Sequence, residues 1–142
     1  MGQAILSAFE TYCKAAGLRP TDPRKHVLEI VARHKKPVTA YEVLEALGQK
    51  LDNPKPPTAY RALDFLTQHG FVHRIESLNA YVACRENHKH GGSQFMICES
   101  CGRVEEAHLC DLPPALEIQV EEKGFHLAFW NIEIHGRCAA CG

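Results

Sequence analysis

Two Cys-x-x-Cys pairs constrain the fold of this chain more than any other feature. The pairs are Cys98/Cys101 and Cys138/Cys141, and a glycine follows the second cysteine of each. At this spacing two thiolates can turn toward one metal ion, and the glycine allows the backbone to turn in toward the sulfurs. Four sulfur ligands form a closed tetrahedral shell that suits zinc and leaves no open position for catalysis. We therefore expect one structural zinc ion in the C-terminal part of the chain.

Disulfide bonds and a redox-active dithiol are the alternatives for these cysteines. The chain has seven cysteines and no secretion signal in its first residues, so we expect a cytoplasmic protein, in which disulfides are rare. A redox Cys-x-x-Cys motif usually occurs once, beside a β-α-β pattern that the sequence lacks. The apolar runs are too short to cross a membrane. Cys13 and Cys110 are expected to pack as small apolar side chains.

The N-terminal part of the chain has the pattern of four helices followed by a β-hairpin. Apolar residues recur at helical spacing in residues 4–16, and Thr21-Asp22-Pro23 is a helix-start signal. Thr39 and Glu42 have the spacing of a capping box at the start of a third helix. A fourth helix follows Pro56-Pro57-Thr58 and ends at Gly70, and residues 71–76 and 81–84 are two short β-prone runs. Three helices and a hairpin are the layout of a winged helix-turn-helix domain.

The C-terminal part alternates between strand and helix patterns. Strands are expected at residues 94–98 and 103–107, and a helix at residues 112–123. Phe125, Leu127 and Phe129 alternate with polar or small residues, and the alternation changes parity at Trp130, which predicts a β-bulge there. This part is close to the size at which an apolar core alone fails to hold a fold, so it needs a staple or a partner.

These patterns predict an α+β chain with a winged-helix domain in residues 1–84, a hinge in residues 85–92 and a small α/β domain in residues 93–142. Charge is unevenly divided between the two parts. Residues 1–83 contain 11 Lys+Arg and 8 Asp+Glu, whereas residues 84–142 contain 5 and 9. The first part is therefore the better candidate for contact with phosphates.

Several long motifs carry a resemblance to a known family. They are Pro57-Thr58-Ala59-Tyr60-Arg61-Ala62-Leu63-Asp64-Phe65-Leu66, Gly70-Phe71-Val72-His73, Tyr81-Val82-Ala83-Cys84, Cys98-x-x-Cys101-Gly102 and His135-Gly136-Arg137-Cys138-Ala139-Ala140-Cys141. From about Leu18 onward the chain resembles the ferric uptake regulator (Fur) superfamily, and in particular its zinc uptake regulator branch. The resemblance implies a zinc-dependent repressor of zinc uptake genes that binds palindromic, AT-rich operator DNA. It also implies a homodimer formed through the dimerisation domain in residues 93–142.

The resemblance places the helix of residues 57–69 in the major groove of DNA. Arg61 would read guanine, because a guanidinium can donate to both O6 and N7 of that base. Thr58, Tyr60 and Tyr41 would touch the DNA backbone or base methyl groups. Two alternatives stay open here: Tyr60 could pack in the core, and Arg61 could be a solvated surface residue. Pro56-Pro57 replaces the usual polar cap of the family and leaves the first residue of this helix open.

The resemblance also implies a second, regulatory zinc site. Its ligands would be His73, Cys84, His90 and Glu106. Two imidazoles, one thiolate and one carboxylate form a shell that zinc accepts, and the thiolate argues against a site tuned for Fe(II). Glu105 competes with Glu106, and His88 competes with His90. Two zinc ions per chain are therefore expected, and the second would join the wing to the C-terminal domain.

Other functions explain less of the sequence. A zinc deaminase needs a His-x-Glu triplet and a Pro-Cys-x-x-Cys motif, and neither occurs, so we expect no enzyme and no small-molecule substrate. A zinc-stapled protein-interaction module would explain the four cysteines but not the helices and wing. An iron or peroxide sensor of the same superfamily is the nearest competitor. The remaining histidines show no spacing that predicts a third metal site.

Overall fold

The computed structural model describes residues 2–34, 36–84, 92–106 and 111–142. The chain divides into two units, Met1–His88 and Lys89–Gly142. The α+β class is confirmed, because the first unit combines four α-helices and the second unit one, among the described residues, each with its own three-stranded sheet. None of the helices in the described ranges is both long enough and apolar enough to span a bilayer.

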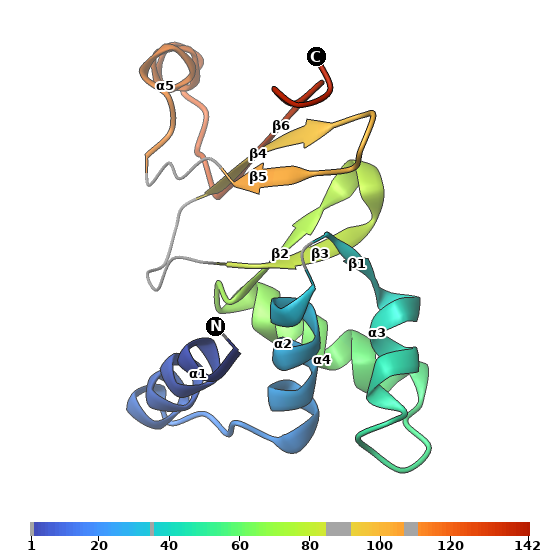
Figure 1. The fold of residues 1–142 in the computed structure, drawn as a ribbon. Helices are drawn as coiled ribbons and strands as arrows, with labels where there is room; N and C mark the ends of the chain where they lie inside the picture. Colours follow the sequence, from blue (N-terminus) through green and yellow to red (C-terminus); the bar gives the residue numbers. More distant parts are fainter. Residues whose placement is uncertain (1, 35, 85–91, 107–110) are drawn as a thin grey trace. The chain divides into compact units, whose positions relative to one another are not determined.

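The first unit is a winged helix (Figure 1). Its helices are α1 (Gly2–Ala16), α2 (Asp22–Arg33), α3 (Ala40–Leu47) and α4 (Pro56–Gln68). Its strands are β1 (Val38–Thr39), β2 (Val72–Ile75) and β3 (Ala80–Ala83), with a 3-10 turn, η1 (Glu76–Leu78), between the last two. The antiparallel sheet has the order β1-β3-β2, and β2 with β3 forms the expected hairpin.

Local signals determine where these helices begin and end. The predicted capping box is present, with the Glu42 backbone N–H donating to Thr39 Oγ1 and the Thr39 N–H donating to Glu42 Oε1, both at 3.1 Å. At α2 the start signal Thr21-Asp22-Pro23 predicts a capping side chain directly before Pro23 at the first helical position. The helix instead begins at Asp22, and Thr21 is the capping residue without a side-chain bond. The Thr21 carbonyl instead accepts from the Lys25 N–H at 3.0 Å.

The core of the first unit holds α4 by its inner face. Ala59, Ala62, Leu63 and Leu66 of α4 are buried together with apolar residues of α2 and α3. Phe9 of α1 is fully buried, and its ring lies edge-on to Phe71 at 5.1 Å between centroids. The opposite face of α4 is exposed.

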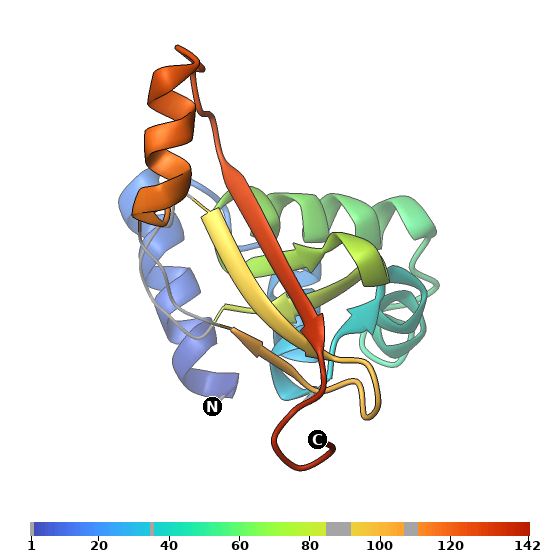
Figure 2. The ribbon, with the colours of Figure 1, turned by 90° about the horizontal axis from the view of Figure 1, so that it is seen from above.

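The second unit is a small sheet with one helix (Figure 2). Its elements are β4 (Gly92–Cys98), β5 (Val104–Glu106), α5 (Pro114–Glu122) and β6 (Trp130–Gly136). The sheet has the order β5-β4-β6, in which β4 is antiparallel to β5 and parallel to β6. The parallel register pairs Gly92 with Trp130 and Cys98 with Gly136, so the two strands end together.

Three expectations for the second unit are corrected. The β-bulge near Trp130 is wrong, because the ladder between β4 and β6 is regular and residues 125–129 form no strand. Helix α5 begins at Pro114 rather than residue 112, because a residue that precedes proline is disfavoured in the helical region. Gly92 was expected in the hinge but is the first residue of β4. Residues 85–91 of the expected hinge lie outside the described residues.

Candidate functional site

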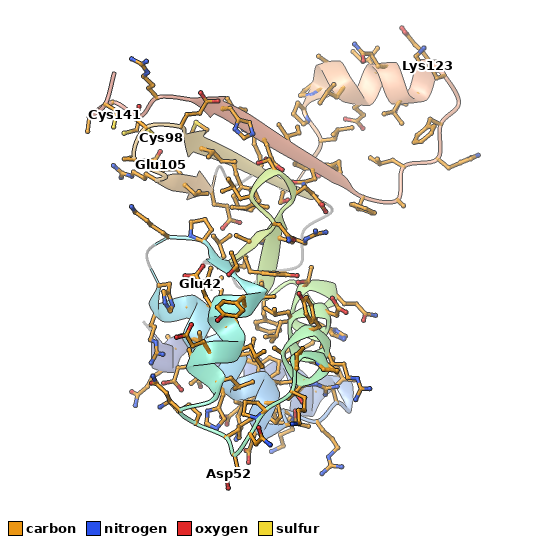
Figure 3. All side chains as sticks on the ribbon, turned by 90° about the vertical axis from the view of Figure 1, so that its right-hand side faces the viewer. Glu42, Asp52, Cys98, Glu105, Lys123 and Cys141 are labelled. Atoms are coloured by element: carbon orange, nitrogen blue, oxygen red, sulfur yellow. The ribbon has the colours of Figure 1, made fainter. Side chains whose placement is uncertain are left out.

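The four predicted zinc-ligating cysteines come together at one end of the second sheet. Cys98 ends β4, Cys101 lies in the turn before β5, and Cys138 and Cys141 follow β6. Their four Sγ atoms all lie within 4.8 Å of one another. Figure 3 shows Cys98 and Cys141 side by side at this end, away from Lys123 at the end of α5. The parallel pairing of β4 with β6 thus brings the two Cys-x-x-Cys pairs to one place.

Both Cys-x-x-Cys pairs are shaped by tight backbone turns. The Gly102 N–H donates to the Cys98 carbonyl at 3.0 Å, and the Gly142 N–H donates to the Cys138 carbonyl at 2.8 Å. Gly102 has a φ of 77°, a left-handed conformation that favours glycine. The Glu99 N–H donates to the Gly136 carbonyl at 2.8 Å and ties the first turn to the strand that leads into the second pair.

The sulfur cluster fits a zinc ion. Zinc–sulfur bonds of about 2.3 Å in a tetrahedron separate the sulfurs by about 3.8 Å. The Sγ atoms of Cys101 and Cys138 are 3.8 Å apart. All four thiols are free of disulfide bonds. The four residues would therefore hold the ion, which would supply a tetrahedral cross-link between the two turns.

The pKa values of two of these thiols move in opposite directions. Hydrogen bonds from the backbone N–H groups of Cys101 and then Cys138 lower the pKa of Cys98 to about 6. The pKa of Cys141 is raised to about 12, first by its hydrogen bond with the Cys138 side chain and then by those with Cys98 and Cys101. The first thiol of the cluster thus loses its proton readily, whereas the last one holds its proton strongly. A divalent cation removes that opposition, because it neutralises the accumulated negative charge.

Two of the four proposed regulatory ligands lie together in the wing. His73 is on β2 and Cys84 follows β3, where its N–H donates to the Phe71 carbonyl at 2.9 Å. The hairpin register pairs His73 with Val82, so His73 and Cys84 project from the same face. A ring nitrogen of His73 and the sulfur of the buried Cys84 lie within 4.8 Å of each other. The wing therefore offers one imidazole and one thiolate to the same ion.

The other two proposed regulatory ligands belong to other segments. Glu106 is a half-buried residue on β5 of the second unit, where it pairs with Phe95. The competing Glu105 is exposed, and its carboxylate forms an ion pair with Arg103 at 3.1 Å. His90 and its competitor His88 lie outside the described residues, as does Cys110.

Residues predicted to contact DNA lie on exposed surfaces of the helix-turn-helix. Arg61 is exposed on α4, Tyr60 and Tyr41 have exposed fractions of 52% and 74%, and Thr58 is half-buried. The alternative that Tyr60 packs in the core is therefore wrong. Helix α4 begins at Pro56 after Lys55, without a side-chain cap, which settles the start that Pro56-Pro57 left open.

A shallow hollow lies between α3 and α4, beside the predicted DNA contacts. Its volume is about 200 Å³. Ala40, Tyr41, Leu44, Pro56, Ala59 and Tyr60 line it. The two tyrosines thus flank an apolar depression at the start of α4, the helix predicted to read DNA.

Three residues that hold α4 against the rest of the first unit were not identified from the sequence. The Arg24 guanidinium lies 3.6 Å from the centre of the Phe65 ring on α4. The Tyr12 hydroxyl is 2.8 Å from Nδ1 of His69, directly after α4. His69 is half-buried, and this contact fastens the end of α4 to α1. Contacts between residues so far apart in the chain leave no local pattern that could have revealed them.

Comparisons with known proteins agree on one family. Residues 15–135 match the Ferric uptake regulator family. The chain is 38% identical to the Zinc uptake regulation protein of Escherichia coli over 141 residues, which cover 98% of this chain and 82% of that protein. It is 27% identical to the Peroxide operon regulator of Bacillus subtilis over 140 residues, covering 96% and 92%. A solved structure of a zinc uptake regulator complexed with zinc and DNA matches with a TM-score of 0.91 at 37% identity and covers 99% of this chain and 94% of that one. The structure of holo XcZur matches with a TM-score of 0.86 at 40% identity, covering 96% of both chains.

Proposed function

Because the chain belongs to the ferric uptake regulator family, we propose that it is a zinc-dependent transcriptional repressor that controls zinc uptake genes. The observation that carries this proposal is the match over nearly the whole chain to a zinc uptake regulator whose structure contains zinc and DNA. The family consists of transcription regulators, so the chain is not an enzyme. Its place of action is then the cytoplasm, where the operator DNA lies.

The reading helix supplies the proposed contact with operator DNA. Its outer face presents Arg61 and Tyr60, while its inner face is anchored in the core. An exposed guanidinium in the first turns of the second helix of a helix-turn-helix is placed to donate to guanine O6 and N7. Tyr41 and Tyr60, which line the hollow between α3 and α4, and Thr58 on α4 complete the proposed contact surface.

The proposed oligomer is a homodimer formed through the second unit. That unit exposes large apolar side chains beyond those that its small core can bury. They are Leu116, Ile118, Phe125, Leu127, Phe129 and Ile134. Exposed apolar side chains in this number are typical of an interface, and a two-fold dimer would present two reading helices to the halves of a palindromic, AT-rich operator.

The proposed metal content is two zinc ions per chain. Cys98, Cys101, Cys138 and Cys141 would hold the structural ion, and His73, Cys84, His90 and Glu106 the regulatory one. Support for the second set is the pairing of His73 and Cys84 on one face of the wing. Since its proposed ligands come from both units, a bound ion would restrict their relative orientation and shift the population toward the DNA-binding form. By reciprocity, operator DNA must then tighten the binding of that zinc.

The nearest second candidate is an iron or peroxide sensor of the same family. Relatives with those names match this chain at lower identity, for example 27% for the Peroxide operon regulator of Bacillus subtilis. The buried thiolate donor Cys84 argues against this candidate, because an Fe(II) site favours nitrogen and oxygen ligands.

A metal titration tests the proposed function. The purified protein is depleted of its regulatory metal and mixed with a random duplex pool, and zinc, Fe(II) or Mn(II) is added in separate series. We expect zinc alone to produce tight, sequence-selective binding at low free metal. Equal binding without added metal would contradict zinc-dependent repression, and selective binding with Fe(II) alone would favour the iron sensor. Metal analysis of the loaded protein should give two zinc ions per chain.

A further inference from the structure

Asp64 is an exposed carboxylate on the outer face of the reading helix. The helix turns about 100° per residue, so Asp64 and Arg61, three positions apart, project within about 60° of each other. Both lie opposite the buried stripe of Ala59, Ala62, Leu63 and Leu66. Any groove that receives Arg61 therefore also receives Asp64.

The Asp64 carboxylate forms no hydrogen bond or ion pair with the described residues of its own unit, and its charge only adds to the effect of burial in raising the pKa of Tyr81. Among the described residues it makes no hydrogen bond and no ion pair, although Arg61 stands at a spacing where such pairs often form. Asp64 also contributes little to the stability of the fold, because it is exposed and the core contacts of α4 come from the opposite face. The Asp64 carboxylate and the Arg61 guanidinium are thus both available to an external partner.

A carboxylate that enters the major groove is unfavourable unless a donor receives it. The surrounding phosphates repel it, and an ionised carboxylate only accepts hydrogen bonds. Guanine presents only acceptors at its N7 and O6, and adenine places the acceptor N7 beside its N6 amino donor, where it would repel a carboxylate. Cytosine presents the N4 amino group as a donor without an acceptor of its own beside it. Asp64 lies about 4.5 Å further along the helix axis than Arg61, a little more than the 3.4 Å step between base pairs.

From this placement we infer that Asp64 is a second base-reading residue, which accepts a hydrogen bond from the N4 amino group of a cytosine at a base pair next to the one that Arg61 reads. This inference rests on the proposed function and extends it from one specificity-determining residue to two of opposite charge. Arg61 selects a base whose major-groove edge accepts hydrogen bonds, and Asp64 selects a base whose edge donates one. The two residues together therefore determine which base pairs the helix faces on the DNA, as well as how tightly it binds.

A substitution that changes the hydrogen-bonding pattern tests the role of Asp64. In Asp64→Asn the side chain can both donate and accept, which matches the N7 and N6 of adenine. Duplexes selected by the zinc-loaded wild-type protein from a random pool are remade with each base pair varied in turn, and binding is measured by competition. We expect one position to prefer cytosine by about 5- to 150-fold in the wild type. Asp64→Asn should move that preference toward adenine, and Asp64→Ala should abolish it.

Asp52→Asn is the matched control, because Asp52 is an exposed carboxylate at the tip of the connection between α3 and α4 (Figure 3). It removes the same charge and should leave every base preference unchanged. If Asp64→Asn raises the affinity for all duplexes equally, as loss of simple repulsion would, the inference is wrong. A change confined to the guanine that Arg61→Ala also affects would overturn it as well, since Asp64 would then only orient Arg61.

The outcomes separate this inference from the function on which it rests. If the zinc-loaded wild type selects no sequence, both are overturned. If it selects a sequence and Asp64→Asn selects the same one, only the role of Asp64 is overturned. Circular dichroism and metal content of each variant should match the wild type, since Asp64 is exposed and belongs to none of the proposed ligand sets.

Discussion

Single residues in this chain divide into those that hold the fold and those available for recognition. The Sγ atoms of the four clustered cysteines lie within 4.8 Å of one another. These cysteines bring the turn after β4 against the segment that follows β6. Arg61 and Tyr60, by contrast, are exposed on a helix whose other face is buried. Substitutions should therefore separate stability from specificity.

Replacing Arg61 with alanine should reduce discrimination between operator and random DNA. Loss of one bidentate contact to guanine costs about 1–3 kcal/mol of selectivity. Competition binding against random DNA measures the change, and the melting temperature should stay within about 1–2 °C because the residue is exposed. Lys50→Ala, which removes an exposed positive charge outside α4, is the control and should keep the selectivity. Unchanged selectivity of Arg61→Ala would refute its role as base reader.

Replacing Cys84 with serine should abolish the zinc response while the structural zinc remains. Serine removes the only thiolate of the proposed regulatory set, and Cys84 is 3% exposed within the wing. The measurement is zinc-dependent DNA binding together with zinc content, expected to fall from two ions to one. Normal zinc-dependent DNA binding by this variant would contradict the assignment of Cys84 as a regulatory ligand. Glu105→Gln serves as a control, since that carboxylate is engaged by Arg103.

The thiolate of Cys98 should make the zinc-free protein more stable as the pH rises. The pKa of Cys98 is about 6 in the folded protein against an ordinary value of 9.0. A depressed pKa means that the unfolded chain binds more protons between these values, so this contribution is full above pH 9 and is lost as the pH falls through 6. Urea unfolding of reduced, zinc-free protein at pH 5.5 to 8.5 should show a steeper rise for the wild type than for Cys98→Ser. Equal slopes would contradict the shift.

Elements of regular structure were predictable where their signals are local. The capping box of Thr39 and Glu42 and the glycines after α1 and α4 mark helix ends, and all lie where the sequence indicated. Each Cys-x-x-Cys pair was recognisable for the same reason, because the spacing within a pair is a local property. That the four cysteines hold one zinc ion stays a prediction, which their closeness supports. The regulatory set stays a prediction, since its proposed ligands are scattered over four segments.

Long-range features were not predictable from local patterns. The parity change at Trp130 suggested a bulge, but it marks the first residue of a strand whose partner, β4, begins opposite it at Gly92. Phe125 and Phe129 alternate like strand residues yet are 67% and 76% exposed. The hydrogen bond of Tyr12 with His69 joins residues 57 positions apart. Only the folded chain shows which segments meet.

Replacing Gly92 with alanine should disrupt the start of the β4–β6 ladder. A Cβ atom at this position would lie 2.2 Å from the Trp130 ring and 2.4 Å from its carbonyl oxygen. Overpacking of this kind costs about 1–3 kcal/mol, measured as a lower midpoint of thermal or urea unfolding. Gly136→Ala at the other end of the ladder is the matched control, because a Cβ there meets nothing within 4 Å. Equal stability of the two variants would contradict the close approach to Trp130.

The whole molecule combines a first unit with a well-filled core and a second unit with a small one. In the second unit only Phe95, Ile97, Cys98 and Trp130 are buried apolar residues among those described. Helix α5 has no buried residue at all. We therefore expect the stability of the second unit to depend on the proposed zinc ion and the proposed partner subunit.

Replacing Phe129 with aspartate should weaken the homodimer. Phe129 is 76% exposed, so the substitution removes no core contact within one chain but would place a charge in the proposed interface. Analytical ultracentrifugation at micromolar concentration should show a shift from dimer toward monomer. Glu122→Gln at the exposed end of α5 is the comparison and should remain dimeric. A fully dimeric Phe129→Asp variant would place the interface elsewhere.

The shared end of β4 and β6 has a consequence for how the chain can vary in length. The Cys98–Cys101 turn lies against Cys138 and Cys141. The segment between the two cysteine pairs, which carries β5 and α5, is therefore one long loop. Doubling the length of such a loop costs only about 0.6 kcal/mol, so insertions beside α5 should be tolerated. One residue inserted between Cys98 and Cys101 would instead turn a sulfur away from the cluster. Natural variants of this protein should therefore differ in length around α5 and stay constant within each cysteine pair.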